Sequence, residues 1–309
     1  MGFKFKLGGG VSHPIKLGRN IMKLSDQRVV KELNEKVIAS MKECRDSNKS
    51  WKPSWVGGKS GLAYNLFTNH IFTGGNQLVA LFTGADDKWA TTSALKKNKL
   101  SWRKGSKMTW FLRPVTITKD KDGNELLKPF VFFKPYPMVN GIDIVGLPEE
   151  EVKEVTLEER HHIADKLIAN LGVELRETNN GKCFYDPSGD YIHMPHKHNF
   201  ESVDAYYSVL FHEIGHWTGH KSRLDRLNAE KSEAENAYAF EELVAELASM
   251  YLASYVGIDF EPTEQNATYL NGWLKALEND TTFIWKASSY ASKIVNYIID
   301  AQVEVKKAA

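Results

Sequence analysis

Two histidines and a glutamate in one short apolar run are the residues of this sequence best suited to chemistry. The segment SVLFHEIGHWTGHKSRLDR places His212 and His216 four residues apart, with Glu213 directly after the first. On a helix this spacing puts both imidazoles on one face, where they can reach a single ion. A metal ion lowers the pKa of a bound water, and Glu213 is placed to accept the proton. The pattern, HExxH, is typical of zinc metallopeptidases.

The residues around this motif favour a metal site over a surface helix with two unconnected histidines. The neighbouring side chains are strongly apolar: Val209, Leu210, Phe211, Ile214 and Trp217. Burying histidines and a carboxylate among such side chains is costly unless the polar groups are compensated, for example by an ion.

A catalytic zinc usually has three protein ligands, so one more ligand is expected. A histidine six residues after His216 would complete the pattern HExxHxxGxxH, but that position is Ser222, and His220 comes two residues too early. The later segment YAFEELVAELASMYL offers glutamates instead. We predict Glu242 as the third ligand. Glu246, one turn later on the same face, is predicted to hold a ligand histidine.

Glu241 is the alternative metal ligand. If Glu242 is the ligand, we expect Glu241, like Glu246, to contact a ligand without binding the metal itself. It points about 100° away from Glu242 on a helix. A solvated acidic face is the other interpretation of this run. The predicted reaction is hydrolysis of a peptide bond, with Glu213 as general base and then as proton donor to the leaving amine. The donor that stabilises the oxyanion stays open among His220, Arg223, Tyr238 and Tyr269.

The elements that must position these residues indicate an α+β chain with two domains. The pattern predicts a flexible arm over residues 1–24, a basic mixed α/β domain over 25–148 and a mainly helical domain with a small β-sheet over 149–309. In the first domain, Ser25 is predicted to cap a helix that ends near Cys44, and Asp122-Gly123 is predicted to turn a β-hairpin. In the second, Thr156 and Glu159 form a capping box. A strand–turn–strand unit then precedes four helices, expected near 202–220, 235–256, 264–277 and 282–302.

The two halves differ strongly in charge although the whole chain has a net charge of only +1. Residues 1–148 contain 25 Lys+Arg and 11 Asp+Glu, whereas residues 149–309 contain 15 and 28. The net charges are therefore +14 and −13. This split suggests a polyanion as partner of the basic half, although attraction between the halves is an alternative.

The basic half contains five of the eight tryptophans, and aromatic rings in a positive groove suit single-stranded DNA. Bases stack on the rings while Lys and Arg pair with phosphates. The segment LKKNKLSWRKGSK is the most basic stretch. The predicted DNA contacts are Lys96, Lys97, Lys99, Trp102, Arg103, Lys104, Lys107, Trp51 and Trp55.

Composition restricts where the protein acts. No apolar run approaches the length of a membrane span, and the first residues, MGFKFKLGGG, lack the apolar core of a secretory signal. Cys44 and Cys183 show no pairing pattern, which fits a reducing compartment. We therefore expect a cytoplasmic protein without a membrane partner. Zinc is the expected ion, with Mn²⁺ or another divalent ion as the alternative.

Both halves resemble the ArdC-type antirestriction proteins. The C-terminal segments YDPSGDYIHMP, YYSVLFHEIGHWTGHKSRLDR, YAFEELVAELAS and YLNGWLKAL are similar to their zincin-like domain. The segments WKPSWVGGKSGLAYNLFTNHIFTGGNQLVALF and KWATTSALKKNKLSWRKGSKMTWF are similar to their single-stranded-DNA-binding domain. The resemblance covers most of residues 26–300. It implies a plasmid or phage protein that protects incoming DNA from restriction. It also implies His212, His216 and a glutamate of EELVAEL as metal ligands, and Glu213 as the catalytic glutamate.

Two other functions remain open on the sequence. The chain could mask DNA and hold a structural metal, or it could be a metallopeptidase without a role on DNA. The presence of Glu213 favours a peptidase, because a structural metal site needs no general base. A host restriction or DNA-processing protein is then the expected substrate. A nuclease is disfavoured because the sequence lacks an acidic cluster suited to two magnesium ions.

Overall fold

The computed structural model describes residues 23–52, 61–120, 123–148, 155–227, 234–262 and 267–308. The predicted arm over 1–24 falls almost entirely outside these residues, as do Trp55 and Asp122.

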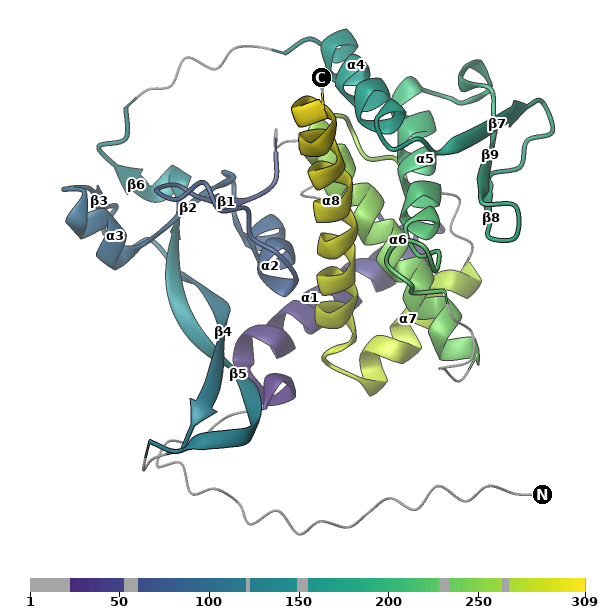
Figure 1. Cartoon of the computed structure of the whole chain (residues 1–309). Coiled ribbons are helices and arrows are strands. Elements are labelled where there is room, and N and C mark those ends of the chain that lie inside the picture. The colour runs from purple at the N-terminus through teal and green to yellow at the C-terminus, as the bar shows by residue number, and fades with distance from the viewer. Residues whose placement is uncertain are drawn as a thin grey trace, which may run out of the picture.

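Helix α1 (Arg28–Asp46) belongs to the N-terminal half in sequence but packs on the C-terminal helix α7 (Ala267–Asn279) (Figure 1). Its buried stripe recurs at helical spacing: Val30, Leu33, Val37 and Met41. The side-chain amide of Asn34 donates to the Leu277 carbonyl at 3.0 Å. Ser25 does not cap this helix. It lies in the 3-10 turn η1 (Leu24–Asp26), and the helix begins after Gln27, whose side chain makes no capping hydrogen bond.

A four-stranded sheet forms the centre of the basic half, in the order β1-β2-β5-β4. Its strands are β1 (Tyr64–Asn65), β2 (Lys88–Thr91), β4 (Thr109–Lys119) and β5 (Glu125–Asn140). The predicted hairpin is confirmed, because β4 and β5 pair antiparallel from Thr109↔Met138 outward. Helix α2 (Gly75–Thr83) packs on β4, where Asn76 hydrogen-bonds both backbone groups of Leu112. The outer part of the hairpin extends away from the helices (Figure 1).

A small lobe at the edge of this sheet carries the most basic segment. It contains α3 (Thr92–Lys97), β3 (Ser101–Trp102), the 3-10 turn η2 (Gly141–Asp143) and β6 (Ile144–Val145). Strands β3 and β6 pair antiparallel. The Thr91 side chain caps α3 by accepting from the Ala94 amide.

The C-terminal half begins with helix α4 (Leu157–Ala169), and its predicted capping box between Thr156 and Glu159 is confirmed. A three-stranded sheet follows in the order β7-β9-β8. The predicted strand–turn–strand unit corresponds to β8 (Phe184–Asp186) and β9 (Tyr191–Pro195). Strand β7 (Glu174–Thr178), which pairs parallel with β9, was not predicted. The 3-10 turn η3 (Lys197–Asn199) leads to the helices.

The remaining helices are α5 (Val203–Trp217), α6 (Ala234–Val256) and α8 (Phe283–Ala308). Helix α6 packs against both α5 and α8. Gly215 allows α5 to approach α6 closely, because a Cβ atom there would lie in a tight contact, 3.1 Å from Ala245 Cα. This contact brings the histidine face of α5 onto the glutamates of α6.

The α+β class is confirmed, with a mixed half and a mainly helical half that share one hydrophobic core. No helix among the described residues is both long and apolar enough to cross a membrane. The division at residue 148 stays a prediction, and α1 contributes to the helical side of the core.

Substitution of Trp51 tests whether the two halves share one hydrophobic core. It is fully buried, donates its Nε1 hydrogen to Ser40 Oγ at 3.1 Å and meets Trp273 edge-to-face at 6.4 Å. Trp51→Ala should lower the free energy of unfolding by about 3–5 kcal/mol, because the cavity cannot close completely. Chemical denaturation measures this difference. A loss below about 1 kcal/mol would contradict the packing of the N-terminal half on α7.

Candidate metal centre

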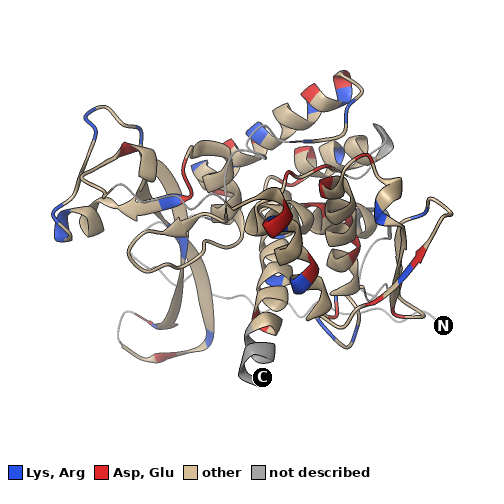
Figure 2. Cartoon of the chain, turned by 90° about the horizontal axis from the view of Figure 1, so that it is seen from above, with Lys and Arg blue, Asp and Glu red and all other residues tan. Residues whose placement is uncertain are grey.

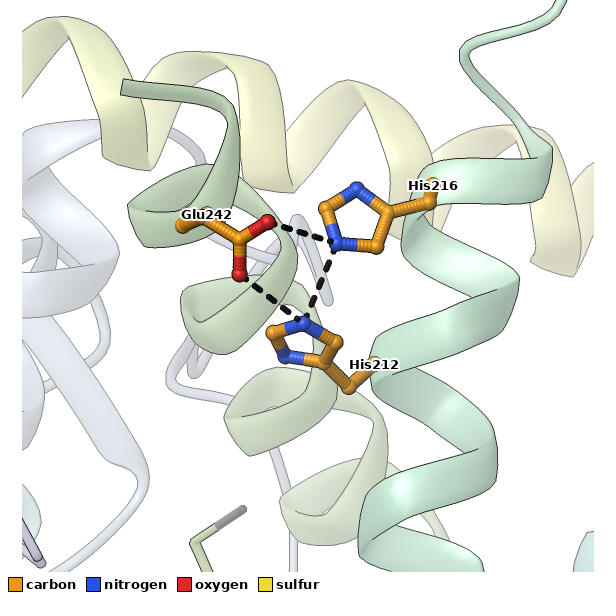
Figure 3. A group of neighbouring side chains, drawn as sticks. All are labelled: His212, His216 and Glu242. Carbon is orange, nitrogen blue, oxygen red and sulfur yellow. Dashed lines mark hydrogen bonds and ion pairs between the residues drawn. The ribbon is translucent and has the colours of Figure 1, made fainter. Parts of the chain in front are cut away.

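The motif histidines lie on the face of α5 that packs against α6. Ser202 begins this helix by accepting a hydrogen bond from the Ala205 amide. Fifteen residues of continuous helix then carry His212 and His216 one turn apart. Their rings point toward Glu242 of α6, as Figure 3 shows. The sequence-predicted ligands are therefore brought together by the packing of two helices.

The three ligand atoms have the spacing that one metal ion requires. His212 Nε2 lies 3.1 Å from His216 Nε2. The Glu242 oxygens lie 3.5 Å from each of these nitrogens. Ligand atoms about 2.0–2.1 Å from a tetrahedral ion lie about 3.3 Å from each other. Each nitrogen is near a different Glu242 oxygen, and one ligand atom from each of the three residues lies within 4.8 Å of the others, which suits zinc or an ion of similar size.

Each histidine has a carboxylate at its other ring nitrogen. Glu246 Oε2 lies 3.0 Å from His212 Nδ1, and Glu241 Oε1 lies 3.5 Å from His216 Nδ1. A carboxylate at Nδ1 favours a proton there and leaves the Nε2 lone pair free. Two such lone pairs facing each other at 3.1 Å repel unless a cation or a proton lies between them.

The charges of the cluster are strongly coupled. Burial lowers the pKa of His212, but hydrogen bonds to Glu242 and Glu246 outweigh it and hold that pKa well above its ordinary value. Burial raises the pKa of Glu242, yet His212 and His216 together bring it below the usual range. The raised pKa of His212 and the lowered pKa of Glu242 show that each of these two groups favours the charged form of the other.

Glu213 acts on this cluster through its charge, which contributes to the raised pKa of His212. It is only 7% exposed, yet it forms no hydrogen bond or ion pair with another described residue. Burial, with the negative charge of Glu213, raises the pKa of the Cys183 thiol to about 11. This interaction places the Glu213 carboxylate toward the segment that leads into β8.

The structure distinguishes the four candidates for an oxyanion donor. The Arg223 guanidinium is bound to Asp190 and to the Trp217 carbonyl, and His220 Nδ1 lies 2.8 Å from Ser222 Oγ. Tyr238 is exposed, and its hydroxyl lies 2.9 Å from that of Tyr269.

Tyr238 is also one of the groups that lower the pKa of the Glu242 carboxylate, although His212 and His216 contribute more. The geometry therefore favours Tyr238 as the donor.

The second histidine group does not form a metal site. In the segment HMPHKH, which contains His193, His196 and His198, His193 lies in β9 and is buried. Its Nδ1 is 2.8 Å from the Lys182 carbonyl oxygen, and its Nε2 is 3.0 Å from Thr178 Oγ1. Among the described residues, only His212, His216 and Glu242 form a group that could hold an ion.

The predicted basic DNA contacts lie on the small lobe of α3 and β3, on the opposite side of the molecule from α5 (Figures 1 and 2). The six basic side chains are exposed, and none of them forms an ion pair with an acidic group of a described residue. They are Lys96, Lys97, Lys99, Arg103, Lys104 and Lys107. The ion pairs that join the two halves are instead Lys42–Glu278 and Lys52–Glu261.

The predicted aromatic contacts need correction. Trp51 is wrong as a DNA contact, because its ring is fully buried against Trp273 and cannot stack on a base. Trp55 lies outside the described residues, and Trp102 is half-buried. Trp110, which the sequence reasoning missed, is 50% exposed on β4. Its neighbour Phe111 is buried. Because neighbouring side chains of a strand point to opposite faces, the sequence indicates that one of these two aromatic side chains faces outward, but not which one.

Comparison with known proteins finds relatives of the domain that carries this site and of most of the chain. A family model described as zincin-like metallopeptidase matches residues 162–290, which contain the three candidate ligands. The chain is 34% identical over 294 residues to a DNA primase TraC of Escherichia coli. That match covers 88% of this chain but 27% of the primase, and a second TraC primase is matched over 19% of its length.

Solved structures give a likeness over nearly full length. The metal-free crystal structure of the antirestriction protein ArdC from plasmid R388 has 29% identity and a TM-score of 0.72, covering 90% of this chain and 99% of ArdC. Its Mn(II)-bound structure has 30% identity and a TM-score of 0.68, covering 88% and 97%. By this likeness in sequence and in fold, the chain belongs to the ArdC family of antirestriction proteins.

Proposed function

We propose that this chain is an antirestriction protein that combines a divalent-metal-dependent peptidase site with a surface for single-stranded DNA. It would act in the cytoplasm of the cell that receives the DNA. The observation that carries the proposal is the group of His212, His216 and Glu242, whose ligand atoms are already spaced for one ion. The Mn(II)-bound form of ArdC supports a divalent ion, and the nitrogen and carboxylate ligands suit zinc as well as manganese.

In the proposed reaction, His212, His216 and Glu242 would hold the ion, which would lower the pKa of a water molecule and polarise the carbonyl of the peptide bond. Glu213 accepts the proton of the attacking water and passes it to the leaving amine. The Tyr238 hydroxyl donates to the developing oxyanion, and its partner Tyr269 holds it in place. The place of Glu213, directly after the candidate ligand His212 and without a hydrogen bond to another described residue, supports this role because its carboxylate is available to a water molecule.

The DNA surface is proposed from the small lobe of α3 and β3. Its six basic side chains have no acidic partner among the described residues, so their charge is available to phosphates. Exposed apolar side chains lie in the same chain segments: Met108, Trp110, Ile142 and Val145. Phosphate contacts combined with aromatic stacking are what single-stranded nucleic acid uses. The similarity to TraC, a DNA primase, also favours a partner among nucleic acids.

A DNA-masking protein with a structural metal remains the second candidate. The exposed basic lobe alone would suffice for masking, and it lies away from the metal site (Figure 1). The two candidates differ in whether Glu213 is needed for protection.

Substitution of the third ligand tests the metal site. Glu242→Gln should weaken binding of Zn²⁺ or Mn²⁺ by about a hundredfold or more, because the neutral amide is a far poorer ligand. Competition with a fluorescent chelator measures this affinity. Glu278→Gln is the matched control, since Glu278 is an exposed glutamate that pairs with Lys42. Normal affinity in Glu242→Gln, together with lost affinity in Glu241→Gln, would show that Glu241 is the ligand.

Glu213→Gln tests whether the site is catalytic. The variant should still bind the metal, since Glu213 is not one of the three candidate ligands, but should lose about 10²–10⁴-fold in hydrolysis. Its effect on protection is measured as survival of unmodified DNA delivered to a restricting host. Full protection by Glu213→Gln would favour DNA masking over proteolysis.

Charge removal on the small lobe tests the DNA surface. The triple change of Arg103, Lys104 and Lys107 to Gln should weaken binding of labelled single-stranded DNA and reduce the slope of log affinity against log salt by about 2. Trp110→Ala should cost about 1–3 kcal/mol of binding, whereas Trp51→Phe should cost none.

Fluorescence anisotropy across a salt series measures these quantities. A triple change to Gln on the helical half, at Lys166, Lys275 and Lys293, is the control for equal charge. An equal loss of affinity in this control would argue against a localised surface.

A further inference from the structure

Arg226 is a buried arginine behind the metal ligands to which the proposed reaction assigns no role. Its side chain is only 6% exposed and lies in the segment between α5 and α6. A guanidinium stays charged at any physiological pH, so burial at this place requires specific partners.

The first partner of Arg226 is Glu241, which it holds with two hydrogen bonds. Nε lies 3.2 Å from Glu241 Oε2, and Nη2 lies 2.8 Å from Oε1. The same Oε1 lies 3.5 Å from His216 Nδ1. Arg226, Glu241 and His216 thus form a continuous chain of charged contacts that ends on a ligand ring.

The second group of partners fixes Arg226 to the helix that carries His216. Nη2 donates to the Gly215 carbonyl at 2.6 Å, and Nη1 donates to Thr218 Oγ1 at 2.9 Å. Gly219 leaves room for this arrangement, because a Cβ atom there would lie 3.1 Å from Arg226 Nη2 and 2.8 Å from Leu227 Cγ. The guanidinium is therefore bound to both α5 and α6 at the level of the ligands.

We propose that Arg226 is a positioning residue for the metal ligand His216 and that it acts through Glu241. The proposal rests on the metal site proposed above. A planar guanidinium that binds both carboxylate oxygens sets the rotation of the carboxylate as well as its charge. Held this way, Glu241 orients the His216 ring and cannot turn toward the ion in place of its neighbour Glu242. Partners of this kind typically change metal affinity 10–100-fold.

Arg223 offers a matched control in the same segment. It is similarly buried, at 8% exposure, and also binds a carboxylate, that of Asp190. Its other contacts are the Trp217 carbonyl, the Trp217 ring and the hydroxyls of Tyr185 and Ser222. None of these groups binds a ligand histidine, so Arg223 shares the burial and charge of Arg226 without its connection to the metal.

The experiment compares Arg226→Met, Arg226→Lys and Arg223→Met in the full chain loaded with Co²⁺. Affinity is measured by chelator competition, coordination geometry by the visible absorption spectrum of Co²⁺, and folding by thermal denaturation. Arg226→Met should weaken Co²⁺ binding about 10–100-fold and change the spectrum. Arg226→Lys should recover part of the affinity, since it keeps the charge but not the fork. Arg223→Met should lower the melting temperature and leave both metal measurements unchanged.

Glu241→Gln keeps the test decisive if Arg226→Met fails to fold. This variant has the same shape as the wild type and should also weaken Co²⁺ binding and change the spectrum. In a folded double variant, the two changes should cost no more affinity than either one alone, because they act on one chain of contacts.

Unchanged affinity and spectrum in Arg226→Met would overturn the proposal, as would an equal loss of affinity in Arg223→Met. A wild-type chain that binds no Co²⁺ would instead overturn the metal site itself.

Discussion

The contact between helices α5 and α6 at Gly215 and Ala245 is the constraint on which the rest of the structure depends. It brings two imidazole nitrogens and a carboxylate to within 3.5 Å of one another in a buried place. Close approach of this kind is expensive in a protein interior, because every buried polar group needs a partner. The cluster meets this requirement with two more glutamates and one arginine. A large share of the polar groups of α6 thus serves to hold two histidines of α5.

The basic half depends on the same helical core, although its sheet and its charged lobe lie to one side of it. Helix α1 packs on α7, Trp51 meets Trp273, and Phe133 of β5 lies near Trp285 of α8. The opposite charges of the two halves do not hold them together, since the described ion pairs across them are few and partly exposed. Apolar packing fixes the halves, which leaves the charge of the small lobe free to act on a partner.

The metal group was predictable from the sequence because helical spacing carries the information. Residues four apart lie on the same face of a helix, as His212 and His216 do on the first helix and Glu242 and Glu246 do on a second apolar helix. The capping box at Thr156 and the hairpin of β4 and β5 followed from equally local signals.

What the sequence did not reveal depends on contacts between distant segments. Ser25 has the right chemistry for a cap, but the preceding 3-10 turn moves the helix start beyond it. Trp51 has basic neighbours in sequence, yet its ring faces a helix more than two hundred residues away. Arg226 gave no signal, because its importance arises only when Glu241 and Gly215 are placed beside it.

Anomalous diffraction at the absorption edge of the metal, from crystals of the protein loaded with Zn²⁺ or Mn²⁺, would locate the ion directly. We expect one strong peak about 2.0–2.2 Å from His212 Nε2, His216 Nε2 and a Glu242 oxygen, with an open position toward solvent. A peak bound by Glu241 in place of Glu242, or a peak elsewhere in the molecule with none at this site, would contradict this expectation.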